Sequence, residues 1–178
     1  MLSEIVLVGL PGAGKTTVGR QLARRLKLPF TDSDQVIEQR IGCSIRDFFA
    51  REGEEAFRDV EQEVIDELTR DQTAQVLSTG GGVVLRPVNR QHLRERGRVV
   101  YLRSYPEELY RRLRHDTSRP LLQVDDPMVK LRELFDVRDP LYRETAHFVM
   151  ETGRPSVPTL VNMITMQLEL SPGAFTVP

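Results

Sequence analysis

Residues 9–16 constrain this chain more than any other stretch of its 178 residues. They read GLPGAGKT and fit the pattern GxxxxGK followed by Ser or Thr, in which several backbone N–H groups point inward at phosphate oxygens. The apolar run 5–8 before this loop is typical of a buried strand, and Val18, Leu22 and Leu26 follow it at helical spacing. A chance match in a glycine turn is the alternative, but the flanking strand and helix favour a nucleoside triphosphate site.

Each part of this phosphate loop suits one part of a bound nucleotide. The Lys15 side chain can reach the terminal phosphates, and the Thr16 hydroxyl can bind Mg²⁺. The helix that follows adds the positive end of its dipole to the backbone amides. We therefore expect the nucleotide to contact Gly12, Ala13, Gly14, Lys15, Thr16 and Thr17.

Beyond the loop, short apolar strands alternate with longer amphipathic segments, which predicts a parallel sheet covered by helices on both faces. Strands are expected at about 5–8, 30–32, 75–78, 98–102 and 147–150. Helices are expected from 15, at 46–51 and 54–68, from 87, at 106–114, at 128–146 with a break near Pro140, and at 158–170. The chain is thus expected to be a single three-layer α/β/α domain over 1–170, with a mobile lid at about 114–125 and a disordered tail at 171–178.

Composition narrows the functional classes. The 25 basic and 26 acidic residues balance, which argues against nucleic-acid binding. Cys43 is the one cysteine, so no disulfide can form within the chain. The sequence has no run of about 18 apolar residues, and Glu4 stands where a signal peptide would be positive. We therefore expect no membrane association and a cytoplasmic location.

The phosphate loop alone does not identify the reaction that the chain catalyses. A GTPase would need an NKxD and a later DxxG, which the sequence lacks, and a motor-type ATPase needs a longer chain. A small kinase needs a second substrate pocket and a closing element that carries an arginine. The sequence offers candidates for both.

An acidic pair and a glycine triplet each follow an expected strand. In the acidic pair Asp32 and Asp34, one carboxylate could hold Mg²⁺ through water while the other accepts a hydrogen bond from a substrate hydroxyl. The alternative is that Asp32 or Ser33 simply caps the next helix. The triplet 80–82 suits close approach of the backbone to a ligand, or a tight turn. Ligands bind beyond the carboxyl ends of parallel strands, so these features and the phosphate loop indicate one site.

Three arginines are further candidates, each with a structural alternative. Arg58 lies at helical spacing from Glu54 and Glu61, which could be an ordinary solvated ion-pair network. Arg119, in the expected lid, could stabilise a transferring phosphoryl group or be an exposed loop residue. Arg138 alone is typical of a solvated helix residue.

Taken together and in this order, the motifs closely resemble those of shikimate kinases. The resemblance covers about 5–150, most of the chain, and is far more specific than the phosphate loop alone. The matching stretches are GLPGAGKTTVGRQLA, FTDSDQVIE, GEEAFRDVE, STGGGVV, SRPLL and RDPLYRETA.

This resemblance implies a P-loop fold of nucleoside monophosphate kinase type, with five parallel strands and a substrate-binding segment at about 33–61. It implies that Asp34 holds ring hydroxyls of shikimate, that Arg58 and Arg138 grip its carboxylate, and that the Gly80 amide donates to it. Two phenylalanines would supply apolar walls. The implied substrate site comprises Asp34, Phe49, Phe57, Arg58, Gly80, Gly81, Gly82 and Arg138.

The resemblance also implies the nucleotide side of the site. Asp32 would join Thr16 around Mg²⁺, Arg119 would lie near the transferred phosphate, and Arg154 would lie near the adenine. The implied catalytic residues are Lys15, Asp34 and Arg119, and the implied cofactors are ATP and Mg²⁺.

The function expected from the resemblance is transfer of the ATP γ-phosphoryl group to the 3-hydroxyl of shikimate, in aromatic amino-acid biosynthesis, by a monomer. A kinase of the same fold acting on gluconate or another polyol acid is one alternative. A nucleotide-binding regulatory protein without catalysis is another, although such proteins often lack the residues matching Lys15 or Arg119.

Overall fold

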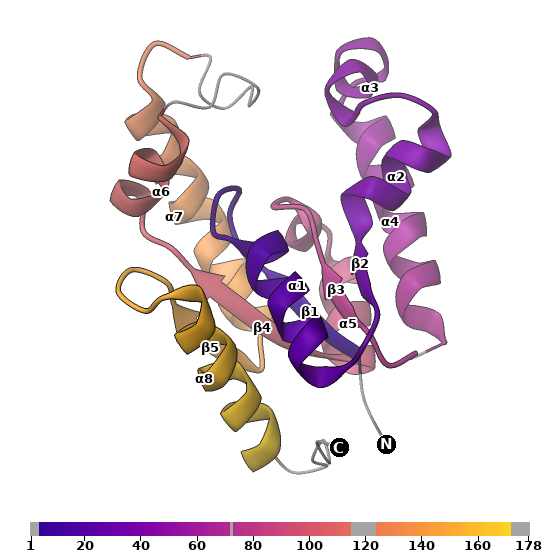
Figure 1. The fold of residues 1–178 in the computed structure, drawn as a ribbon. Helices are drawn as coiled ribbons and strands as arrows, with labels where there is room; N and C mark the ends of the chain where they lie inside the picture. The colour runs from indigo at the N-terminus through magenta and orange to yellow at the C-terminus, as the bar shows by residue number, and fades with distance from the viewer. Residues whose placement is uncertain (1–3, 72, 115–123, 172–178) are drawn as a thin grey trace.

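The computed structural model describes residues 4–71, 73–114 and 124–171. Its centre is a five-stranded parallel sheet, as the sequence predicts, and the strands lie in the order β2-β3-β1-β4-β5. The strands are β1 (Glu4–Val8), β2 (Phe30–Asp32), β3 (Val76–Ser78), β4 (Gly97–Arg103) and β5 (Phe148–Glu151). Helices cover both faces of the sheet, which confirms the three-layer α/β/α architecture (Figure 1).

Helices connect successive strands, and one more follows β5. They are α1 (Lys15–Leu26), α2 (Ser33–Ile41), α3 (Ile45–Glu52), α4 (Glu54–Arg70), α5 (Pro87–Arg96), α6 (Pro106–Leu113), α7 (Pro127–Thr145) and α8 (Val157–Leu170), with a 3-10 turn η1 (Val83–Leu85). No helix in the described part of the chain is long and apolar enough to cross a membrane.

The alternation of side chains along β1 divides the core into two layers. Ile5 and Leu7 pack on one face with the apolar residues of α1 and α8. Val6 and Val8 pack on the other face with residues of α4 to α7, among them the buried Tyr142.

The helices α2, α3 and α4 form a lobe that rises beyond the β2 edge of the sheet (Figure 1). It has a small core of its own, built from Ile37, Phe57 and Val64. The helix α3 is capped at its start, because the Ser44 hydroxyl accepts a hydrogen bond from the Asp47 amide at 3.1 Å. This lobe contains the segment 33–61 that the sequence assigns to substrate binding.

The structure differs from the predicted elements in three details, the first being α2, for which the sequence predicts no bounds. The predicted break at Pro140 is wrong: α7 continues through it, because Leu131 before the proline and Tyr142 after it are both buried against the same core. The turn η1 after the glycine triplet was not predicted. Most of the predicted lid, 115–123, and of the predicted tail, 172–178, lies outside the described residues.

At the other end of the sheet from the phosphate loop, Glu4 is buried at the start of β1. Its Oε1 accepts a hydrogen bond from Gln75 Nε2 at 3.3 Å, whereas Oε2 has no hydrogen-bond partner among the described residues. Burial raises the pKa of the Glu4 carboxyl from 4.5 to about 7, against the lowering effects of Gln75 and Arg96. The folded chain therefore holds this proton more tightly than the unfolded chain, and the resulting stabilisation is lost as pH rises from about 4.5 to 7.

We expect Glu4→Gln to have little effect on the melting temperature at pH 5 and to raise it by a few degrees at pH 8, where the wild-type carboxyl is charged. Thermal unfolding across this range measures the difference. Glu67→Gln is the matched control, since Glu67 is exposed and paired with Arg40, and it should bring no gain at pH 8. Melting temperatures of wild type and Glu4→Gln that stay parallel across the range would contradict this account.

Candidate active site

The phosphate loop lies at the carboxyl end of β1, where two of its glycines have left-handed backbone conformations. Gly12 has φ 86° and Gly14 has φ 92°, both unfavourable for other residues, and Gly14 is the N-cap residue that directly precedes α1. The Lys15 ammonium donates to the carbonyl oxygens of Gly9 at 2.6 Å and Leu10 at 3.0 Å. The ammonium therefore lies directly over the loop that would receive phosphates.

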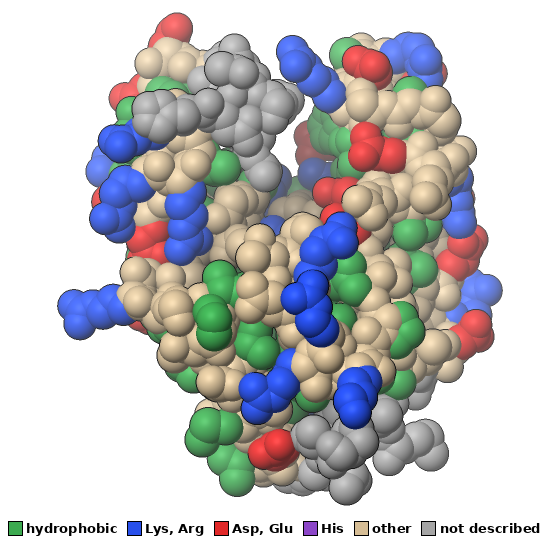
Figure 2. Space-filling model, viewed as in Figure 1, with side chains coloured by type: hydrophobic (Ala, Val, Ile, Leu, Met, Phe, Trp, Pro, Cys, Tyr) green, Lys and Arg blue, Asp and Glu red, His purple; other side chains and the backbone are tan. Residues whose placement is uncertain are grey.

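Two cavities adjoin this loop, and the molecular surface is hollowed between the α2–α4 lobe and the rest of the molecule (Figure 2). The first cavity has a volume of about 380 Å³. Its walls come from the carboxyl ends of β1, β2 and β3, as predicted for a parallel sheet. The lining residues are Pro11, Gly12, Gly14, Lys15, Thr16, Thr17, Asp32, Asp34, Ser78, Thr79, Gly80 and Gly81.

Within the phosphate loop, Ala13 is the predicted nucleotide contact that does not line this cavity. Its side chain is buried in the core, and its amide donates to the Leu10 carbonyl at 3.1 Å. That hydrogen bond closes the turn of the loop and so supports the amides on either side of it.

The second cavity, of about 240 Å³, lies between the α2–α4 lobe and α7. Phe49 and Phe57 form one wall, with ring centroids 4.9 Å apart. The remaining lining residues are Pro11, Asp34, Ile45, Arg58, Glu61, Gly80, Gly81, Gly82 and Arg138. The structure thus brings every predicted substrate residue to one cavity.

Asp34 lines both cavities and marks their boundary. Burial, together with the negative charges of Asp32 and Glu61, raises the pKa of its carboxyl to about 6, against the lowering effect of Lys15. Such an acid titrates just below neutral pH, in the range useful for proton transfer. The capping alternative also holds for Asp32, whose Oδ1 accepts the Asp34 amide at 3.0 Å while its side chain still lines the first cavity.

Arg58 is not a solvated helix residue, since only 8% of it is exposed. Its Nη1 pairs with Glu61 Oε1 at 2.8 Å, its Nε lies 3.5 Å from Glu54, and its guanidinium lies 5.1 Å from the Phe57 ring centroid. Burial raises the pKa of Glu61 despite this pairing. Two buried groups of opposite charge therefore sit in the cavity wall, and a bound anion could approach the arginine from the open side.

The glycine triplet gives each of three site groups room to approach the backbone. A Cβ on Gly80 would lie 2.7 Å from Asp34 Oδ1, and one on Gly82 would overlap the Arg58 guanidinium. A Cβ on Gly81 would lie 2.7 Å from Pro11 and 3.3 Å from Arg138 Nη1. The triplet is therefore explained by close packing around the cavities and not by a tight turn alone.

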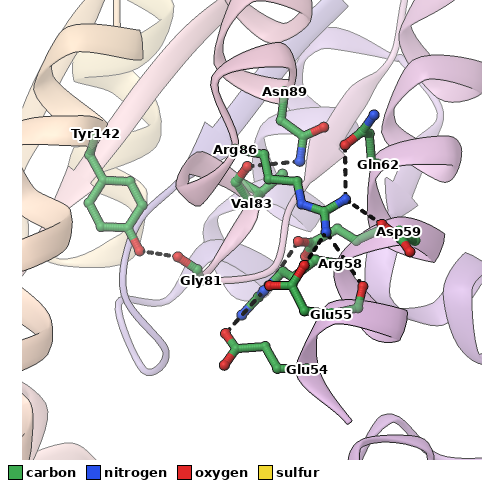
Figure 3. Close-up of polar contacts among 11 residues, drawn as sticks. Glu54, Glu55, Arg58, Asp59, Gln62, Gly81, Val83, Arg86, Asn89 and Tyr142 are labelled. Atoms are coloured by element: carbon green, nitrogen blue, oxygen red, sulfur yellow. Dashed lines mark hydrogen bonds and ion pairs between the residues drawn. The ribbon is translucent and has the colours of Figure 1, made fainter. Parts of the chain in front are cut away.

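Arg138 reaches the second cavity from the opposite side, on α7. Its neighbour Asp139 is buried and accepts hydrogen bonds from the Tyr101 hydroxyl at 2.7 Å and Arg103 Nε at 3.0 Å. The Tyr142 hydroxyl, one turn further on, donates to the Gly81 carbonyl (Figure 3). These contacts fix α7 against β4 and the glycine triplet, and so fix the position of Arg138.

Besides Ala13, two further predicted nucleotide residues are not placed in the cavities. Arg154 is exposed in the loop after β5 and lines neither cavity, and Arg119 lies outside the described residues. Sequence reasoning missed Arg112, which donates to the carbonyl oxygens of Gly12 at 3.1 Å and Thr152 at 3.2 Å. This arginine holds the Arg154 loop beside the phosphate loop, and no spacing signal in the sequence indicates it.

A family model described as shikimate kinase matches residues 11–169 of this chain. The chain belongs to the shikimate kinase family. A shikimate kinase of Paracidovorax citrulli is 66% identical over 170 residues, covering 94% of this chain and 93% of the relative. Membership in the shikimate kinase family confirms the resemblance that the motifs predict.

Solved structures of shikimate kinases agree with the fold. The shikimate kinase from Acinetobacter baumannii in complex with shikimate has a TM-score of 0.89 at 46% identity, covering 96% of this chain and 97% of that one. The shikimate kinase from Aquifex aeolicus has a TM-score of 0.80 at 32% identity, covering 93% and 96%. The predicted P-loop fold of nucleoside monophosphate kinase type is therefore confirmed.

Proposed function

We propose that this chain transfers the γ-phosphoryl group of ATP to the 3-hydroxyl of shikimate, yielding ADP and shikimate 3-phosphate. The observation that carries this proposal is that Asp34 lines both the cavity around the phosphate loop and the cavity that holds Arg58 and Arg138. An acceptor alcohol at Asp34 would thus adjoin the outer phosphate. Family membership supports both substrates.

The second cavity suits a small ring that carries one carboxylate and several hydroxyls. Arg58 and Arg138 enter it from opposite sides, and each guanidinium can offer paired donors to a planar carboxylate. The rings of Phe49 and Phe57 can contact the apolar face of the substrate. In this proposal the backbone of the glycine triplet contacts the hydroxyls of the substrate, chiefly through the Gly80 amide.

In the reaction, the acceptor oxygen forms a bond to the γ-phosphorus as the bond to the bridging oxygen of ADP breaks. Asp34 holds the attacking hydroxyl in line and takes up its proton, which its raised pKa favours near neutral pH. Lys15 leaves the carbonyl oxygens of Gly9 and Leu10 and pairs with the phosphates, where it offsets the charge that develops. On the sequence evidence alone, Arg119 is proposed to act on the same phosphoryl group.

The residues present fit a magnesium ion held mainly by the nucleotide. Thr16 and Asp32 both line the first cavity, and the described residues contain no cluster of three or more His, Cys, Asp or Glu that could form a cage. Mg²⁺ usually keeps several waters and binds through one or two protein groups plus phosphates. When bound, it would neutralise phosphate charge, with the Thr16 hydroxyl and the Asp32 carboxylate as its protein contacts.

A coupled ADP-release assay with shikimate, gluconate and no acceptor tests the proposal. We expect turnover that depends on shikimate and only background release in the other two arms. Turnover with gluconate and none with shikimate would establish the polyol-acid alternative. A thermal shift with shikimate but no turnover would instead favour the regulatory alternative.

Replacing Arg58 tests the placement of the carboxylate. We expect Arg58→Ala to raise the Michaelis constant for shikimate by about 10- to 150-fold, equivalent to a charge-assisted contact of roughly 1.5–3 kcal/mol, and to leave that for ATP within about twofold. The variant should also melt earlier, because Glu61 would remain buried without its partner.

Arg138→Ala is the companion variant, because among the described residues no ion pair joins Arg138 to a buried carboxylate in the way that Glu61 is paired with Arg58. It should raise the shikimate constant with a smaller loss of stability. Unchanged shikimate constants in both variants would show that the carboxylate binds elsewhere.

A further inference from the structure

Arg86 lies just outside the second cavity and joins two of its walls. It follows the turn η1 and directly precedes α5, and its side chain crosses to α4 (Figure 3). Its Nη1 donates to Asp59 Oδ1 at 2.7 Å and to Gln62 Oε1 at 3.0 Å, and its Nη2 donates to Glu55 Oε2 at 3.2 Å. One guanidinium therefore contacts three successive positions on a single face of α4.

The adjacent face of the same helix turn forms the substrate cavity. Phe57, Arg58 and Glu61 all line it, and they interleave in sequence with the three residues that Arg86 contacts. Because a helix turn moves as a unit, the position of the Arg86 partners determines the position of Arg58.

The glycine triplet forms the facing wall, and it is fixed on its other sides. The Tyr142 hydroxyl donates to the Gly81 carbonyl, and Asn89 Nδ2 donates to the Val83 carbonyl at 3.0 Å (Figure 3). Arg58 packs directly over Gly82, where a Cβ would overlap its guanidinium. The width of the cavity between Arg58 and the Gly80 backbone therefore depends on how α4 is held against this loop.

We propose that Arg86 is a positioning residue for shikimate: it holds the first two turns of α4 at the glycine triplet, so that Arg58 faces the Gly80 backbone at the right separation. The inference rests on the proposed function for the identity of the substrate. Arg86 does not touch the substrate, since it lines neither cavity. Its partners Glu55 and Asp59 are largely exposed, so the network contributes position more than stability.

The chain offers a matched control at the other end of the same helix pair. Arg96, at the end of α5, donates to Asp66 Oδ1 at 2.7 Å and to the Thr69 hydroxyl at 3.2 Å, both on the last turns of α4. Its side chain and that of Arg86 are equally exposed, at 23%. Removing Arg96 should thus loosen α4 against α5 far from the cavity.

Steady-state kinetics of three variants test the proposal. We expect Arg86→Ala to raise the Michaelis constant for shikimate by roughly 5- to 20-fold, with the constant for ATP unchanged, and Arg86→Lys to recover part of the loss. Arg96→Ala should lower the melting temperature at least as much and leave the shikimate constant at the wild-type value. An unchanged shikimate constant in Arg86→Ala, or an equal rise in Arg96→Ala, would overturn the proposal.

Hydrogen exchange provides a readout that does not depend on catalysis. In the unliganded protein, Arg86→Ala should speed amide exchange over 55–62, and Arg96→Ala should speed it over 66–70. If wild type lacks turnover with shikimate, the proposed function fails, while this exchange pattern still decides whether Arg86 holds α4. Should Arg86→Ala fold poorly, the double variant Glu55→Ala with Asp59→Ala removes two of the three side-chain partners of Arg86 from exposed positions and should change the shikimate constant and the exchange over 55–62 in the same direction.

Discussion

Lys15→Ala should lower kcat by roughly 10³-fold or more while the chain stays folded. Phosphoryl transfer depends on positioning and on neutralising charge at the phosphates, and Lys15 is the cation that the phosphate loop presents in the first cavity. The two hydrogen bonds described above for the Lys15 ammonium go to backbone carbonyls of its own loop and not to another element of the fold. The substitution should therefore lower the free energy of unfolding only slightly. Turnover under saturating substrates measures the effect, and thermal unfolding checks the fold.

Arg24→Ala is the control for Lys15→Ala. It removes a positive charge from the same helix, at an exposed position that lines neither site cavity. We expect near wild-type turnover from it. A Lys15→Ala enzyme that keeps more than a tenth of wild-type kcat would refute the role of the loop lysine.

Asp34→Asn should lower kcat by roughly 10²- to 10⁴-fold, because an amide cannot take up the proton of the acceptor hydroxyl. The wild-type kcat/KM for shikimate should also fall as pH drops below about 6, where the carboxyl becomes protonated in the free enzyme. The kcat/KM falls toward acid pH because the unprotonated Asp34 carboxylate is the active form, and this form predominates only above the raised pKa. In Asp34→Asn the residual rate should lose this acid limb.

Glu38→Gln is the control for the pH profile. Glu38 lies on α2 with Asp34, and its negative charge is one of the smaller causes that raise the pKa of Asp34. The variant should keep turnover and move the acid limb slightly to lower pH. An acid limb that persists unchanged in Asp34→Asn would assign it to another group.

The elements of this fold could be predicted because each leaves a local pattern. The phosphate loop needs glycines at left-handed positions, β1 alternates between two core layers, and Ser44 and Pro106 mark helix starts. The helix break expected at Pro140 is wrong because the sequence shows that proline lacks a backbone N–H donor, but it does not show the packing that holds α7 together on either side.

The site was predictable only in part, because the deciding contacts are tertiary. The spacing of Arg58 with Glu54 and Glu61 is the same in a solvated network as in a buried one. The guanidinium can take its buried position because Gly82, distant in sequence, has no side chain to overlap it. Arg86 and Arg112 act through partners on other elements, so no local pattern indicates them.

A crystal structure with shikimate, Mg²⁺ and a non-hydrolysable ATP analogue bound together would test the shared boundary at Asp34 most directly. We expect the shikimate carboxylate between the guanidinium groups of Arg58 and Arg138, and its 3-hydroxyl within hydrogen-bond distance of Asp34 and facing the γ-phosphate at Lys15. Shikimate bound with that hydroxyl turned away from Asp34, or outside the cavity of Phe57 and Arg58, would contradict the account.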